Sequence, residues 1–312
     1  MIIMIDYLIF AFLLILLVVS GIITTRSISN ISSYLGISCF SAGIIIIAII
    51  TSIPELIIGI DSAIEDIPLL SLGDVLGANI IVLSLIIGTA VLISGEINLK
   101  HKPVKKEEKY LSFVAILPLL LGLDQYLSRF DGLILLAAFI FYLFLALKIN
   151  DTINDDKISK KVFLKSSILF ILSIITLLIS AKYLVEYASL IAFEIGVPVI
   201  IIGILLVSFG TSLPEFTFET ISILHGYNLL AVGDLIGSVV TNSTLVLGTV
   251  AIINPLFISN FTQFQIASIF IVVLILVLNI FLKSNIINRL NALFLILVYI
   301  TFLIVTELSI IH

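Results

Sequence analysis

Apolar residues occupy long uninterrupted runs of the chain, and polar residues gather in the short stretches between them. A helix that crosses the hydrocarbon core of a membrane needs roughly 20 consecutive apolar residues. Measured against that length, the pattern predicts ten membrane-spanning helices. They cover approximately residues 6–25, 39–62, 69–95, 109–123, 131–149, 163–184, 195–222, 227–254, 264–283 and 289–309. We therefore expect an all-α membrane protein.

The composition supports this interpretation. Of the 312 residues, 61% are hydrophobic and only 11% are charged. Soluble domains carry about a quarter charged residues, and a soluble core cannot absorb this much apolar sequence. The lipid bilayer is therefore the expected surrounding, and no nucleic acid partner is expected. The first residues lack a basic region and a small-residue cleavage pattern, so we expect a retained helix instead of a signal peptide.

The lysines and arginines predict the orientation of the chain. If the N-terminus lies outside, 13 of the 15 basic residues fall on the cytoplasmic side, and only Arg129 and Lys182 do not. Cytoplasmic loops of membrane proteins carry such an excess of basic residues. We therefore expect a multi-pass protein of the cell membrane with both termini outside.

One motif occurs twice along the chain. Residues 51–56 read Thr-Ser-Ile-Pro-Glu-Leu, and residues 211–216 read Thr-Ser-Leu-Pro-Glu-Phe. A Gly-Asp-x-x-Gly sequence follows each copy, and the offset between the copies is 160 residues throughout. Each half holds five predicted helices, an odd number, so the second half must enter the membrane from the opposite side. We predict two inverted five-helix repeats, 1–149 and 163–312, joined by a cytoplasmic linker at 150–162.

Each copy of the motif places a glutamate directly after a proline inside an apolar run, as Pro54-Glu55 and Pro214-Glu215. Proline leaves nearby backbone carbonyls without their helical partners, and a charged side chain within a membrane is costly. A single proline kink could be a simple bend whose carbonyls are satisfied by neighbouring hydroxyls. Two copies with adjacent glutamates favour a cation site, in which the inverted repeat brings Glu55 and Glu215 face to face near the middle of the membrane.

The residue types indicate which cation such a site would take. Two carboxylates with backbone and hydroxyl oxygens suit Ca²⁺, which takes about six to eight oxygen ligands. The chain has one cysteine, Cys39, and three histidines in loops or at the chain end, so a zinc or copper site is not expected. Neighbouring carboxylates repel each other, so we expect Ca²⁺, Na⁺ and H⁺ to compete for the site. No cofactor is expected beyond the transported ions.

The segments that follow the motifs carry residues spaced by four, which share one helix face. These residues are Asp74, Ala78 and Val82 in the first half and Asp234, Ser238 and Asn242 in the second. Only the second half offers a hydroxyl and an amide oxygen toward a cation, so the halves are unequal. The two aspartates either line the cavity, where they could be linked to protons, or lie at a wet helix start.

Four glycines in these segments form two small-x-x-x-small pairs, Gly73 with Gly77 and Gly233 with Gly237. Such pairs let helices in a membrane approach closely, and we expect them to serve packing.

Two further acidic residues have no acidic counterpart in the other half. Glu219 lies four residues after Glu215 and corresponds to Gly59, and Asp61 corresponds to Ile221. We assign both carboxylates to the rim of the cavity.

The repeated Thr-Ser-x-Pro-Glu and Gly-x-x-x-Gly sequences resemble the alpha-repeats of the sodium/calcium exchangers, a family of the calcium/cation antiporter superfamily. The chain is less similar to the proton/calcium exchanger branch, whose repeats usually read Gly-Asn-x-x-Glu. The resemblance implies that Ca²⁺ is held by Glu55, Glu215 and the backbone carbonyls of Thr51 and Thr211. It implies Na⁺ positions at Ser52, Ser212, Ser238 and Asn242. It also implies that the first and sixth helices move as a gate.

The chain departs from the family pattern at several positions of the third and eighth helices. Ala78 and Val82 stand where the family usually has Ser and Asn, and Asn242 stands where it often has Asp. Asp74 and Asp234 replace the asparagine of the usual Gly-Asn pair. The first half therefore offers fewer side-chain oxygens, and coupling to H⁺ stays open beside coupling to Na⁺.

The hypothesis from the sequence is a secondary antiporter that exchanges Ca²⁺ for Na⁺ by alternating access. One alternative is the same fold with H⁺ coupling or another divalent cation. An intramembrane enzyme that uses the paired glutamates as acid and base is a second alternative, and a passive channel is a third. The absence of Arg and Lys near the motifs argues against the enzyme.

Overall fold

The computed structural model describes residues 2–99, 107–147, 158–194, 208–259, 261–284 and 286–311, and this part of the chain is mostly helical. Among these residues, seven helices are long and apolar enough to cross a membrane. An eighth is added if the bent pair Cys39–Thr51 and Ile53–Ile64 is one span.

The helices of the first half lie on the predicted apolar segments. They are α1 (Ile2–Leu35), α2 (Cys39–Ala42), α3 (Ala48–Thr51), α4 (Ile53–Ile64), α5 (Leu69–Ile81), α6 (Ile87–Ser94), α7 (Glu107–Leu121) and α8 (Arg129–Leu147). Two π-helical segments, η1 (Gly43–Ile47) and η2 (Val82–Ile86), join α2 to α3 and α5 to α6. A 3₁₀ turn, η3 (Gly122–Asp124), ends α7.

The second half repeats this order where it is described. Its helices are α9 (Lys160–Glu194), α11 (Ser208–Thr211), α12 (Leu213–Leu224), α13 (Asn228–Thr241), α14 (Leu247–Ile253), α15 (Phe261–Lys283) and α16 (Arg289–Ile311). The π-helical segment η5 (Asn242–Val246) joins α13 to α14. Most of the predicted linker, and residues 195–207 of the predicted seventh helix, lie outside the described residues.

Both motifs break a helix where the sequence predicted a bend in a continuous one. Ser52, between α3 and α4, has φ −79° and ψ 5°, and Ser212, between α11 and α12, has φ −87° and ψ 7°. The first break turns the chain by 42°. The motif prolines follow in the first turn of α4 and of α12. Proline is tolerated there because the first N–H groups of a helix have no hydrogen-bond partner within it. Each Thr-Ser pair therefore ends one helix, and each Pro-Glu pair begins the next.

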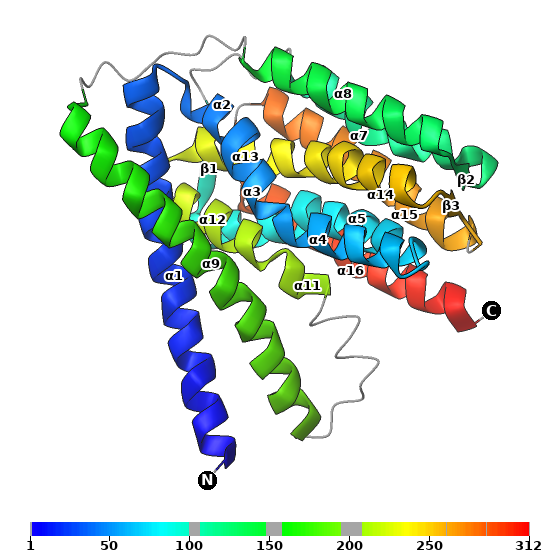
Figure 1. The fold of residues 1–312 in the computed structure, drawn as a ribbon, viewed down its shortest axis with the longest axis horizontal. Helices are drawn as coiled ribbons and strands as arrows, with labels where there is room; N and C mark the ends of the chain where they lie inside the picture. The colour runs from blue at the N-terminus through cyan, green and yellow to red at the C-terminus, as the bar shows by residue number, and fades with distance from the viewer. Residues whose placement is uncertain are drawn as a thin grey trace.

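Helices α1 and α9 lie side by side at the edge of the molecule (Figure 1). Both are longer than predicted: α1 continues through the polar residues near 25–35, and α9 continues to Glu194, past its predicted end at residue 184. In their interface Thr24 Oγ1 donates to Ser173 Oγ at 2.8 Å, and Asn30 Nδ2 donates to Ser166 Oγ at 3.1 Å. Polar side chains within membranes find such partners on neighbouring helices.

Two short antiparallel ribbons, which the sequence did not predict, connect the halves. Strand β1 (Glu96–Asn98) pairs with β4 (Ile286–Asn288), and β2 (Tyr126–Leu127) pairs with β3 (Leu256–Phe257). Adding 160 to the first residue number of β1 gives that of β3, and the same offset relates β2 to β4. The ribbon β1–β4 therefore corresponds to the ribbon β3–β2, and the offset exchanges the two ribbons.

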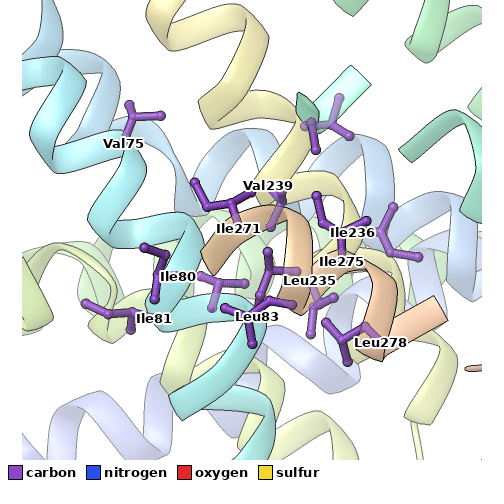
Figure 2. Close-up of a cluster of buried hydrophobic side chains, with 14 of the residues drawn as sticks. Val75, Ile80, Ile81, Leu83, Leu235, Ile236, Val239, Ile271, Ile275 and Leu278 are labelled. Carbon is purple, nitrogen blue, oxygen red and sulfur yellow. The ribbon is translucent and has the colours of Figure 1, made fainter. Parts of the chain in front are cut away.

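The apolar core lies between α5, α13 and α15 (Figure 2). Leu83 of η2, Leu235 and Val239 of α13, and Ile271 and Leu278 of α15 are buried there. This packing fixes the helices that follow the two motifs, and so it positions the polar residues they carry.

Candidate cation site

Glu55 and Glu215 each lie in the first turn of a helix that starts after a break, α4 and α12. Both side chains are buried, with 0% and 1% of their surface exposed. The two carboxylates are close enough to interact electrostatically with each other. Among the described residues none of their four oxygens has a hydrogen-bond partner. The positive end of each helix favours a negative side chain at this place.

The hydroxyl of each motif threonine joins its own half to an aspartate of the other half. Thr51 Oγ1 donates to Asp234 Oδ1 at 3.4 Å and lies 3.4 Å from Ser238 Oγ. Thr211 and Asp74 form the corresponding side-chain hydrogen bond. The 160-residue offset relates these two pairs, so each motif contacts the aspartate-bearing helix of the other half in an equivalent way.

Asp74 and Asp234 lie inside α5 and α13, one turn beyond the helix starts at Leu69 and Asn228. Asp74 interacts electrostatically with Glu55, and Asp234 interacts with Glu215. Asp234 is fully buried, whereas Asp74 is partly exposed.

The remaining predicted site residues lie in the same interior region. Ser52 and Ser212 are buried, and their hydroxyls find no partner among the described residues. Ser238 Oγ donates to Asp234 Oδ1 at 3.4 Å. Asn242 is buried with no described partner for its side-chain amide, and it begins the π-helical segment η5. Such segments occur frequently at functional sites.

Together these residues give an interior region rich in oxygen atoms. Buried polar atoms without partners are rare in native structures, and each one needs an explanation such as a bound ion. In the described parts of the chain, no three His, Cys, Asp or Glu side chains are arranged to hold one metal ion. A cation held between Glu55 and Glu215 would therefore also need hydroxyl or backbone oxygens, as hard cations such as Ca²⁺ accept.

The structure corrects the prediction for Glu219, which we had assigned to the cavity rim. Its side chain is fully buried in α12, whereas Asp61 is exposed. The four-residue spacing from Glu215 was the signal in the sequence, because it sets both glutamates on one helix face. Sequence reasoning also missed Asn79, whose Nδ2 donates to Ser243 Oγ at 2.9 Å and so links α5 to η5.

The glycine pair of the second half lies against the first-half helices. A Cβ atom on Gly233 would lie 2.4 Å from the carbonyl oxygen of Phe40, and one on Gly237 would lie 2.4 Å from Ala48 Cβ. Close helix approach is therefore confirmed for this pair.

A cavity of about 440 Å³ reaches both motifs from the side of α9. Its lining is mostly apolar and includes Pro54 of α4, Lys182 of α9, and Thr211 and Pro214 of the second motif. The two helix breaks therefore share one cavity.

The family described as sodium/calcium exchanger protein matches residues 5–148 and 165–306. The sodium/calcium exchanger MaX1 of Methanosarcina acetivorans is 28% identical to this chain, and the match covers 96% of the chain and 98% of MaX1. The putative antiporter CaxA of Alkalimonas amylolytica is 32% identical over 73% of the chain and 74% of CaxA. The family match includes both motif copies.

Solved structures of the sodium-calcium exchanger NCX_Mj have the same fold. The structure soaked with zero Na⁺ and Ca²⁺ superposes with a TM-score of 0.86 at 26% identity, covering 96% of this chain and 98% of that one. A structure soaked with 2.5 mM Na⁺ and 1 mM Sr²⁺ gives 0.84 at 26% identity, covering 95% and 96%. Exchangers of this family are transporters, not enzymes; they use no cofactor, and their ions are Na⁺ and Ca²⁺. This chain is a multi-pass membrane protein that belongs to the sodium/calcium exchanger family.

Proposed function

We propose that this chain exchanges Ca²⁺ for Na⁺ across the cell membrane by alternating access at a site between Glu55 and Glu215. Family membership supports cation antiport in general. The observation that carries the specific proposal is that both motif glutamates are buried in the first turn of a helix after a break and lack hydrogen-bond partners among the described residues. Two such charges are costly inside a membrane unless a cation lies between them.

Each site residue has a role in this proposal. Glu55 and Glu215 bind Ca²⁺ directly. The backbone carbonyls of Thr51 and Thr211 complete the cage, because broken helices expose such carbonyls to ions in transporters. The oxygens assigned to Na⁺ belong to Ser52, Ser212, Ser238 and Asn242.

The proposed architecture is ten membrane helices in two inverted repeats, 1–149 and 163–312, with both termini outside. The exchange of the two ribbons under the 160-residue offset supports it. So do two helix contacts: a Cβ on Gly88 would meet Ala292 and Ile296, and one on Gly248 would meet Gly132 and Leu136. The same offset relates these contacts, as a pseudo-two-fold axis in the membrane plane would require.

Alternating access needs a path that opens to one side at a time. The cavity beside α9 reaches both motif prolines and supports a path on that side. Helices α1 and α9, the first and sixth of the predicted ten, pack together at the edge of the molecule and make the gate that the family resemblance implies.

The test is calcium uptake into vesicles that contain the purified full-length chain. With an outward Na⁺ gradient at equal pH on both sides, we expect uptake that stops when the gradient is dissipated. Uptake that follows only an imposed pH gradient would contradict the sodium coupling and favour H⁺. Flux of Ca²⁺ without any countertransported ion would contradict antiport and favour a channel.

A further inference from the structure

Glu219 is a second buried carboxylate on α12 that the proposed exchange site does not use. It lies four residues after Glu215, so the two side chains share a helix face with about 5–6 Å between their Cβ atoms. Its side chain is 0% exposed, and neither carboxylate oxygen has a hydrogen-bond partner in the described chain.

The first half has no room for an equivalent carboxylate. Gly59 takes the corresponding place on α4, and a Cβ atom there would lie 2.9 Å from Val250 Cγ2 and 3.0 Å from Ser71 Oγ. The inverted repeat therefore does not generate this acidic residue twice, and any role it has belongs to the second half alone.

The charged groups around Glu219 are all acidic among the described residues. Its carboxylate interacts electrostatically with Asp234 and with Glu215. Asp234 uses Oδ1 to accept from Thr51 and Ser238, and its Oδ2 is buried without a described partner. Three carboxylate oxygens of Glu219 and Asp234 are thus buried without hydrogen-bond partners among the described residues, on two helices, α12 and α13, that pack against each other.

We propose that Glu219 and Asp234 hold a second cation, one helical turn from the Glu55–Glu215 pair and only in the second half. A buried carboxylate needs a counter-charge, and here a bound cation supplies it. The available donors are all oxygens, which selects a hard cation, Na⁺ or Ca²⁺, over zinc or copper. This inference rests on the proposed function, because the exchange site delivers the same ions to the interior.

The test counts bound cations on the purified full-length chain by equilibrium binding of radioactive sodium in one arm and radioactive calcium in the other. The variants are Glu219→Gln and Asp234→Asn, and the matched control is Glu65→Gln, an exposed glutamate between α4 and α5. We expect both variants to bind one cation fewer per chain than the parent, and the control to bind the parental number. The arm that loses the cation identifies it as Na⁺ or Ca²⁺. Parental stoichiometry in both variants and in both arms would overturn the proposal.

A double variant, Glu55→Gln with Glu215→Gln, separates this site from the exchange site. The second cation should stay bound to it while the central one is lost. If the double variant binds no cation and Glu219→Gln binds the parental number, the second site is wrong and the central one stands. If the double variant binds the parental number, the proposed function itself is wrong.

Infrared spectroscopy gives a readout that does not depend on binding stoichiometry. A carboxylate that holds a cation shifts its stretching bands when Na⁺ or Ca²⁺ is added, and this shift should disappear in Glu219→Gln. A carboxylic acid band that saturating Na⁺ and Ca²⁺ leave unchanged, and that Glu219→Gln removes, would show a resident proton and overturn the proposal.

Discussion

The two copies of the Thr-Ser-x-Pro-Glu motif are nearly identical in sequence, yet the residues around them differ. In the second half Glu219, Ser238 and Asn242 place buried polar side chains near the motif. In the first half Gly59, Ala78 and Val82 occupy the corresponding positions. The symmetric features supply one central pair of glutamates. The asymmetric features gather additional oxygens and acidic groups in the second half, so we expect the coupling ions to bind mainly there.

The largest effect is expected from the symmetric pair itself. Glu55→Gln and Glu215→Gln should each weaken Ca²⁺ binding by about 2–5 kcal/mol, because each removes one of the two buried carboxylate charges that bind the cation. The effects should be equal within error, since the two residues occupy equivalent places. Calcium titration of each variant beside the Glu65→Gln control measures this. A large effect in only one variant would break the symmetric account.

Intermediate effects are expected from the glycines. Gly237→Val should destabilise the protein by about 1–3 kcal/mol, the usual range for overpacking, because a Cβ there already collides with Ala48. Gly237→Ala, which adds only the Cβ atom, should destabilise the protein less. Thermal unfolding of the two variants in detergent compares them directly. Parental stability in Gly237→Val would contradict the close approach of α13 to α3.

The smallest effect is expected from the unequal pair Val82 and Asn242. Asn242→Val should raise the Na⁺ concentration that half-saturates exchange, corresponding to about 1 kcal/mol for one lost polar contact. Val82→Asn should lower that concentration or leave it unchanged, because it adds an oxygen to the first half. Sodium-dependent calcium uptake measures both. An unchanged sodium dependence in Asn242→Val would remove this residue from the sodium site.

Much of the fold could be predicted from the sequence, because long apolar runs have one stable form in a membrane. The edges of α5 with α6 and of α13 with α14 lie close to the predicted 69–95 and 227–254. The ribbons could not be predicted, since pairing of β1 with β4 joins residues nearly two hundred positions apart. The extension of α1 past residue 25 was also missed, because Asn30 finds its partner on α9 and Ser32 and Ser33 donate to the backbone of α1 itself. Sequence composition does not reveal such partners.

The candidate site was predicted where repetition marked it and missed where it did not. Glu55 and Glu215 stand out because a charged residue, which is energetically costly within a membrane, recurs at a fixed offset. Glu219 has no counterpart in the first half, so only its four-residue spacing from Glu215 pointed to the site, and its burial depends on the surrounding helices. The hydrogen bond from Thr51 to Asp234 was hidden for the same reason, since it depends on how the two halves meet.

The central claim is that Glu55 and Glu215 jointly hold one divalent cation, and anomalous diffraction from crystals soaked in Sr²⁺ tests it most directly. Strontium shares the preference of calcium for oxygen ligands and marks its position by its anomalous signal. The account predicts one strong peak between the two carboxylates that disappears in the Glu55→Gln, Glu215→Gln double variant. A structure in which both carboxylates are ordered and no peak lies between them at saturating Sr²⁺ would contradict it.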